Sequence, residues 1–212
     1  MAINAQDSPN LNRYQKQNEK LGDPVMGERR IVFMGNSIIE GWKVSDPDLF
    51  SKPGFVNRGI GGQTTPQMLL RFRQDVVDLR PETVVILAGT NDIAGNTGPM
   101  TLSQINNNIV SMVELAQAND IQVVLCSVLP AYDYPWREGM NPNIKIPQLN
   151  AMLKQYASES GIYFLDYFKA MADERNGLPK KYAEDGVHPT REGYDLMKEL
   201  LINALNETMT QR

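Results

Sequence analysis

The residues whose side chains are best suited to catalysis are Ser37, Asp185 and His188. A serine hydroxyl is a poor nucleophile until a base takes its proton, and histidine is the side chain most often used for this. The chain holds one histidine, so there is one candidate base. Asp185 lies three residues before it, where a carboxylate can accept the second imidazole N–H and fix the tautomer. The set predicts nucleophilic acyl transfer; the competing interpretations are a helix-capping serine and a histidine in a surface turn.

Three groups are candidates to hold the negative charge of an acyl-transfer intermediate. They are the backbone N–H of Gly62 in a glycine-rich turn, the side-chain amide of Asn91, and the N–H of Ser37 at a predicted helix start. The competing interpretation is that the glycines permit a tight turn and that Asn91 caps another. We interpret Asp92 as a structural, helix-capping or turn-forming carboxylate and Cys126 as a small buried hydrophobe.

The elements that must position these residues follow from the apolar patterning. Strands are predicted at Ile31–Met34, Phe55–Asn57, Thr83–Ala88, Ile121–Val128 and Ile162–Leu165. Between them lie helical stripes, one of which begins with Thr65 as its cap and another of which ends at Gly161. Alternating strands and helices predict a parallel sheet between helical layers, with ligands bound beyond the carboxyl ends of the strands. Ser37, Gly62 and Asn91 each follow a predicted strand, and Asp185 and His188 precede the last helix.

One long irregular loop is predicted at Ala131–Pro147. Long loops often carry binding residues, and its aromatic side chains Tyr132, Tyr134 and Trp136 can stack on a sugar ring. Packing within the loop is the alternative. We divide the chain into an N-terminal polar arm or helix, residues 1–29, and a catalytic domain, residues 30–212.

Composition excludes several classes of function. The 212 residues carry 21 basic and 25 acidic side chains, a formal net charge of −4, which argues against non-specific binding to nucleic acid. A single cysteine rules out an internal disulfide, and one cysteine with one histidine leaves no multi-ligand metal site of those types, so we expect neither metal nor cofactor. No apolar run approaches the length of a membrane helix. The first residues do not resemble a signal peptide, and a secreted or periplasmic protein whose signal has been removed stays open, as does the oligomeric state.

Four sequence blocks, in order, resemble the SGNH hydrolases, also called GDSL-type esterases. The blocks are Gly35-Asn36-Ser37-Ile38, Gly59-Ile60-Gly61-Gly62, Gly89-Thr90-Asn91 and Asp185-Gly186-Val187-His188. The resemblance spans roughly residues 30–205 and is closest to the branch of platelet-activating-factor acetylhydrolase catalytic subunits and bacterial acetylesterases. It implies a three-layer α/β/α flavodoxin-like sandwich with a five-stranded parallel sheet. It also places the nucleophile at Ser37, the oxyanion donors at Gly62 and Asn91, and the Asp–His pair at the last block.

Two positions depart from the family pattern: Asn36 replaces the usual Asp, and Gln63 stands where many relatives carry Asp. Neither change removes a catalytic group. We expect a metal-free serine esterase acting on a small-molecule or carbohydrate ester. Short acyl groups, above all acetyl, are favoured because the chain shows no extended apolar lid that would cover a long lipid tail. The alternatives are a lysophospholipase or thioesterase on the same site, and a non-catalytic carbohydrate-binding protein of this fold. A dinucleotide-binding module is disfavoured, because Thr64 stands where its third glycine belongs.

Overall fold

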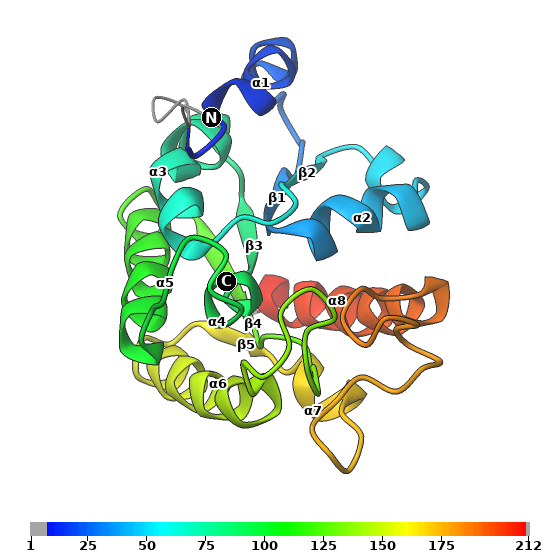
Figure 1. The fold of residues 1–212 in the computed structure, drawn as a ribbon. Helices are drawn as coiled ribbons and strands as arrows, with labels where there is room; N and C mark the ends of the chain where they lie inside the picture. The colour runs from blue at the N-terminus through cyan, green and yellow to red at the C-terminus, as the bar shows by residue number, and fades with distance from the viewer. Residues whose placement is uncertain (1–7, 211–212) are drawn as a thin grey trace.

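The computed structural model describes residues 8–210, so the first seven residues of the predicted arm lie outside the described part (Figure 1). Its strands are β1 (Ile31–Gly35), β2 (Phe55–Gly59), β3 (Thr83–Leu87), β4 (Gln122–Cys126) and β5 (Tyr163–Leu165). Its helices are α1 (Gln15–Leu21), α2 (Ser37–Ser45), α3 (Thr65–Asp75), α4 (Thr90–Ile93), α5 (Leu102–Gln117), α6 (Pro142–Glu159), α7 (Tyr167–Met171) and α8 (Arg191–Thr210). Short 3₁₀ turns lie at η2 (Leu11–Arg13), η3 (Leu49–Ser51) and η4 (Val77–Leu79).

The five strands form one parallel sheet in the order β2-β1-β3-β4-β5. The chain starts near the middle, moves to one edge and then crosses to the other, so the strand order reverses between β1 and β3. Gly35 at the end of β1 lies level with Gly59 on β2 and Leu87 on β3. The loops that follow these three strands therefore leave the sheet at the same edge, where open α/β sheets bind their ligands.

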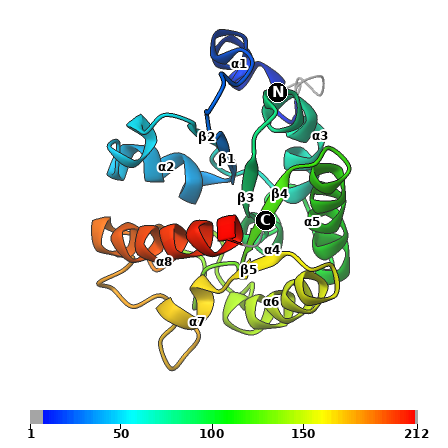
Figure 2. The ribbon, with the colours of Figure 1, turned by 180° about the vertical axis from the view of Figure 1, so that it is seen from behind.

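Helices cover both faces of the sheet, which confirms the predicted α/β/α sandwich. Strand side chains such as Val32, Val84 and Ile86 pack with α3, α5 and α6 on one face. Their neighbours Phe33, Val85 and Leu87 pack with α2, α7 and α8 on the other. Figures 1 and 2 show the two layers on opposite sides of the strands. Burial on both faces explains why the strands are continuously apolar.

The start of α3 differs from the prediction by one residue. Thr64, not Thr65, is the N-cap, and it forms a capping box with Gln67. Thr65 bonds the Asp92 carboxylate instead, through its N–H at 2.9 Å and its hydroxyl at 2.6 Å. Two adjacent threonines look alike as caps, and the tertiary contact with Asp92 decides between them.

The predicted loop at 131–147 is wrong at its end, because α6 begins at Pro142 and runs through Pro147. A proline inside a helix leaves the carbonyl four residues earlier without its N–H donor. Here that carbonyl belongs to Asn143, and the side-chain amide of Asn176 donates to it at 3.1 Å. A distant residue thus compensates for the proline, and the sequence around Pro147 carries no sign of it.

Candidate active site

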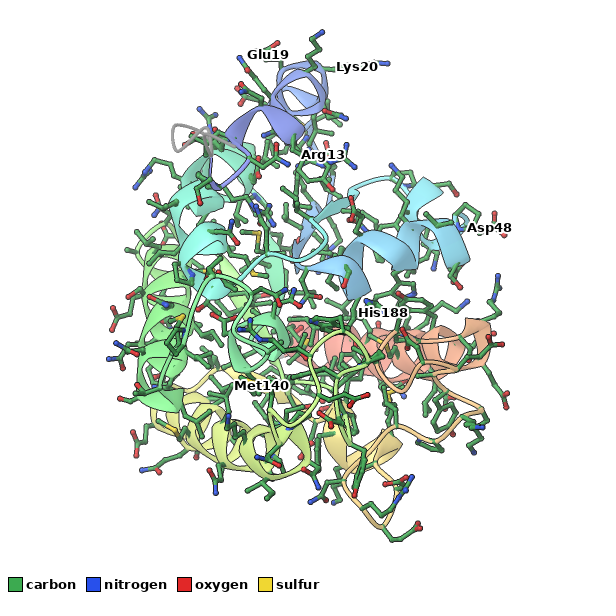
Figure 3. All side chains as sticks on the ribbon, viewed as in Figure 1. Arg13, Glu19, Lys20, Asp48, Met140 and His188 are labelled. Atoms are coloured by element: carbon green, nitrogen blue, oxygen red, sulfur yellow. The ribbon has the colours of Figure 1, made fainter. Side chains whose placement is uncertain are left out.

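A continuous chain of hydrogen bonds joins Ser37, His188 and Asp185. The Ser37 hydroxyl lies 2.9 Å from His188 Nε2, and His188 Nδ1 lies 2.7 Å from Asp185 Oδ2. Ser37 is the first residue of α2, directly after β1, so its N–H has no acceptor within the helix. The structure brings together three residues that the sequence separates by up to 151 positions. Figure 3 shows His188 between α2 and α8.

Asp185 forms hydrogen bonds with both the backbone and the imidazole ring of His188. Its Oδ1 accepts the N–H of His188 at 2.7 Å and that of Val187 at 2.9 Å, while Oδ2 faces the imidazole. Burial alone would raise the pKa of Asp185, but these hydrogen bonds outweigh it and hold the pKa below its ordinary value. Asp185 is therefore a carboxylate at neutral pH, the state needed to stabilise an imidazolium.

The loop after β2 brings Gly62 to the nucleophile. A Cβ built on the preceding Gly61 would lie 3.8 Å from Ser37 Cβ, so the loop packs directly against Ser37. Gly62 itself has a φ of +75°, a left-handed conformation that glycine adopts without strain. Nothing lies within 4 Å of a Cβ built there. Gly62 thus stands on an open side of the loop, one residue after the glycine that packs against the candidate nucleophile.

Asn91 lies on the short helix α4 after β3 and links this helix to the loop after β2. Its side chain is 3% exposed, and its amide nitrogen donates to the Gln63 carbonyl at 2.9 Å. An amide group has two N–H bonds, so one holds the loop while the second can serve a ligand. This places the Asn91 amide and the Gly62 N–H on two connected segments at the same edge of the sheet.

Asp92 lies outside the hydrogen-bond chain and has the structural role that the sequence predicted. Its Oδ1 caps α3 through Thr65, whereas its buried Oδ2 has no hydrogen-bond partner among the described residues. Burial raises the pKa of the Asp92 carboxyl to about 6, against the hydrogen bonds from Thr65, which lower it. Cys126 is likewise fully buried in β4, as predicted.

The aromatic loop before α6 reaches the site through Trp136. Its ring is 44% exposed and lies 6.0 Å from the His188 ring, and it stacks on Tyr134 at 5.0 Å. Tyr134 is fully buried, and its hydroxyl lies 2.9 Å from that of Thr90. The expectation that Tyr134 stacks on a substrate therefore does not fit the structure, because the Tyr134 ring is buried and packs against Trp136.

A groove of about 340 Å³ lies on the Asp185 side of the hydrogen-bond chain. The loops 131–141 and 172–190 form its walls, with Tyr132, Pro135, Arg175 and Lys180 among the lining residues. The Arg175 guanidinium lies over the Tyr132 ring at 4.8 Å from its centroid. The groove is thus lined by aromatic and charged groups, which suits a polar ligand with flat apolar faces.

Residues 33–196 match the GDSL-like lipase/acylhydrolase family. The chain belongs to this family. A GDSL-like lipase from Bacteroides thetaiotaomicron is 48% identical, with a TM-score of 0.92 over 94% of this chain and 98% of its own. The platelet-activating factor acetylhydrolase IB subunit alpha1 of Bos taurus is 28% identical, over 87% of this chain and 78% of that protein. An acetylxylan esterase of Xylanibacter ruminicola is 21% identical, over 83% of this chain and 43% of that protein.

Membership of the GDSL-like family makes the chain an acylhydrolase, an enzyme that cleaves carboxylic esters. Among the helices within residues 8–210, none is long and apolar enough to cross a lipid bilayer.

Sequence reasoning missed three residues that shape the site of this GDSL-like enzyme. Arg71, fully buried on α3, donates to the Gln63 side chain at 2.6 Å and to the carbonyls of Gly35 and Arg58. Glu40, one turn beyond the nucleophile, accepts from the loop that carries Gly62, and Asn96 donates to the Gly62 carbonyl at 3.1 Å. Arg71 lies on the helix predicted to begin at Thr65, but apolar periodicity does not identify a buried arginine.

Proposed function

We propose that the chain is a serine esterase that removes short acyl groups, above all acetyl, from a carbohydrate. The observation that carries the proposal is the hydrogen-bond chain from Ser37 through His188 to Asp185, beside Gly62 and Asn91. The two hydrogen bonds of His188, at 2.9 Å to Ser37 and 2.7 Å to Asp185, fall within the range of about 2.6–3.2 Å that proton transfer by a histidine base requires. Family membership, as an acylhydrolase, agrees with it.

The proposed reaction begins when Ser37 Oγ attacks the ester carbonyl and His188 Nε2 accepts the hydroxyl proton. The carbonyl oxygen becomes an oxyanion, held by the N–H groups of Ser37 and Gly62 and by the Asn91 amide. His188 then returns the proton to the leaving alcohol, and an acyl group remains on Ser37. Water attacks this ester with His188 again as the base, and the acid leaves while Ser37 regains its proton.

The carbohydrate assignment rests on the surroundings of the hydrogen-bond chain. Trp136 presents a partly exposed ring close to His188, and the neighbouring groove combines Tyr132 with Arg175 and Lys180. Sugars offer apolar ring faces edged by hydroxyls, which such a lining can bind. One of the relatives, the acetylxylan esterase of Xylanibacter ruminicola, is named for an acetylated carbohydrate substrate.

The decisive experiment replaces Ser37 with Ala. The variant should lose esterase activity and labelling by a fluorophosphonate serine probe, because the proposed attachment point for the acyl group is gone. Circular dichroism and the thermal midpoint control for folding. A folded Ser37→Ala protein with near-wild-type turnover would overturn the mechanism.

The substrate class needs a separate comparison. We expect kcat/KM to fall from p-nitrophenyl acetate to longer acyl esters, and acetylated xylo-oligosaccharides to be deacetylated. Replacing Trp136 with Ala should raise KM for the oligosaccharide more than KM for p-nitrophenyl acetate, because the small ester has no sugar ring to stack. A preference for long acyl chains or lysophospholipids would instead identify the lipid-directed alternative.

A further inference from the structure

We propose that the N-terminal segment, residues 8–21, is a positioning element for the loop Gly59–Gln63, which carries Gly62. The inference rests on the proposed function, in which the Gly62 N–H holds the oxyanion. Residues 8–21 comprise η2 and α1, and Figure 1 shows them beside α3, apart from the two helical layers. None of these residues belongs to the hydrogen-bond chain of the proposed active site.

Two direct contacts from the segment lie on either side of Gly62. The Tyr14 hydroxyl donates to the Gly59 carbonyl at the beginning of the loop. At its end, the Gln63 side-chain amide donates to the carbonyl of Pro9 at 2.7 Å. Tyr14 is 8% exposed and Gln63 is 4% exposed, so water has little access to replace either bond. The segment therefore holds the loop from both ends.

A third, indirect contact fastens the middle of the loop. Glu40 accepts the Gly61 N–H at 2.8 Å through Oε2, and its Oε1 accepts from the Arg13 guanidinium at 3.0 Å. Glu40 lies three residues after Ser37 on α2. Figure 3 shows Arg13 on the side of the N-terminal segment that faces α2. One carboxylate thus links the nucleophile's helix, the loop and the segment.

Gln63 is suited to this arrangement because it uses both ends of its amide. Its Oε1 accepts from the buried Arg71, which also binds the carbonyl of Arg58 at 2.9 Å, while its Nε2 donates to Pro9. A carboxylate at position 63 would accept from Arg71 equally well, but it could not donate to the Pro9 carbonyl. The glutamine therefore extends the internal support of the loop to the N-terminal segment.

The segment is anchored to α3 by separate bonds. The Asn18 amide donates to Asp75 Oδ1 at 2.8 Å, and the Gln74 amide donates to the Leu11 carbonyl at 2.7 Å. These contacts keep the segment in place when one of its loop contacts is removed. Variants at the loop contacts can therefore test positioning without detaching the segment.

The test uses Tyr14→Phe, which removes the hydroxyl that donates to Gly59, and Gln63→Glu, which removes the amide that donates to Pro9. Both substitutions keep the side-chain volume. The matched control is Gln15→Ala, whose side chain bonds Glu19 on the exposed side of the same segment. For each full-length protein, kcat and KM on p-nitrophenyl acetate, the thermal midpoint, and the Ki of a trifluoromethyl ketone are measured. The ketone forms a hemiketal on a serine, so its affinity reports on the oxyanion site.

We expect Tyr14→Phe and Gln63→Glu to lower kcat by about 10-fold, less than the loss of an oxyanion donor itself, with KM changed less than about twofold. The Ki of the ketone should rise by a similar factor, and Gln15→Ala should behave as the wild type. Glu40→Ala should lose more activity than Glu40→Gln, because the glutamine keeps an acceptor for the Gly61 N–H.

The proposal is overturned if both loop-contact variants match Gln15→Ala in kcat and Ki, or if their losses disappear at temperatures well below their thermal midpoints. These outcomes leave an active wild-type esterase, so the proposed function survives them. A wild-type protein that neither hydrolyses the ester nor reacts with the fluorophosphonate would overturn the proposed function and this inference together.

Discussion

His188 uses both ring nitrogens at once, one toward the Ser37 hydroxyl and one toward Asp185. Its side chain and that of Asp185 are still about two-fifths exposed, at 42% and 41%. The opening at these two side chains leaves room for an ester to bind and, once bound, to exclude water from them. The neighbouring ring of Trp136 covers part of this opening.

Asn91 offers the most direct test of oxyanion stabilisation. Replacing it with Ala should lower kcat by roughly 10²–10³ and leave KM nearly unchanged, the result of losing a donor that acts in the transition state. Steady-state kinetics on p-nitrophenyl acetate measure both constants. A change confined to KM would mean that the Asn91 amide binds the substrate without favouring the transition state.

Asp92 predicts a specific dependence of stability on pH. Burial raises its pKa to about 6 in the folded state, against about 3.9 in an unfolded chain, so the folded protein holds a proton that the unfolded chain has lost. The contribution of Asp92 to stability is therefore greatest below pH 4 and is lost as the pH rises through 6. Asn in its place can still accept from Thr65 but does not ionise.

The difference in the free energy of unfolding between wild type and Asp92→Asn should therefore change with pH. We expect it to move against the wild type by on the order of 3 kcal/mol between pH 4 and pH 7.5. Urea unfolding of both proteins across this range measures it, and other titrating groups cancel in the difference. A difference that stays constant with pH would show that Asp92 does not titrate in this window.

At the scale of elements, the end of α6 shows a local pattern that sequence alone can read. The sequence predicts that this helix ends at Gly161, and Gly161 follows the C-cap Ser160 with a φ of +63°. The Ile162 N–H returns to the Ala157 carbonyl at 3.0 Å, the backbone bond that closes a Schellman motif. The beginning of the same helix differs from the prediction, and Asn176 from a distant loop donates to the Asn143 carbonyl that Pro147 leaves without a donor.

Gly161→Ala should destabilise the fold by about 1–2 kcal/mol, the cost of a left-handed conformation for a residue with a Cβ. Nothing lies within 4 Å of a Cβ built there, so the whole cost is conformational. Gly161→Asn should cost less, because asparagine tolerates this conformation better. Chemical denaturation of the three proteins gives the ranking, and equal losses for Ala and Asn would point to a steric cause instead.

At the scale of the whole molecule, the order of strands explains why candidate residues far apart in the sequence lie at one edge of the sheet. Apolar strands with chemically active turns predict a parallel sheet, and the carboxyl ends of β1, β2 and β3 collect Ser37, Gly62 and Asn91 at one edge. The contacts that hold those turns could not be predicted in the same way. The Gln63 side chain donates to Pro9, and the Arg71 side chain donates to Gln63. The partners of both side chains depend on tertiary packing.

We expect the activity of the enzyme not to depend on a metal ion. In the proposed mechanism His188 moves every proton, and N–H groups hold the oxyanion, so no step requires a Lewis acid. The sequence holds one histidine and one cysteine, and within residues 8–210 no three side chains of His, Cys, Asp or Glu gather as metal ligands. Dialysis against EDTA should therefore leave kcat and KM on p-nitrophenyl acetate unchanged. As a control for effective chelation, a zinc-dependent esterase is dialysed in the same way. Inhibition of this chain that a divalent cation reverses would refute the metal-free assignment.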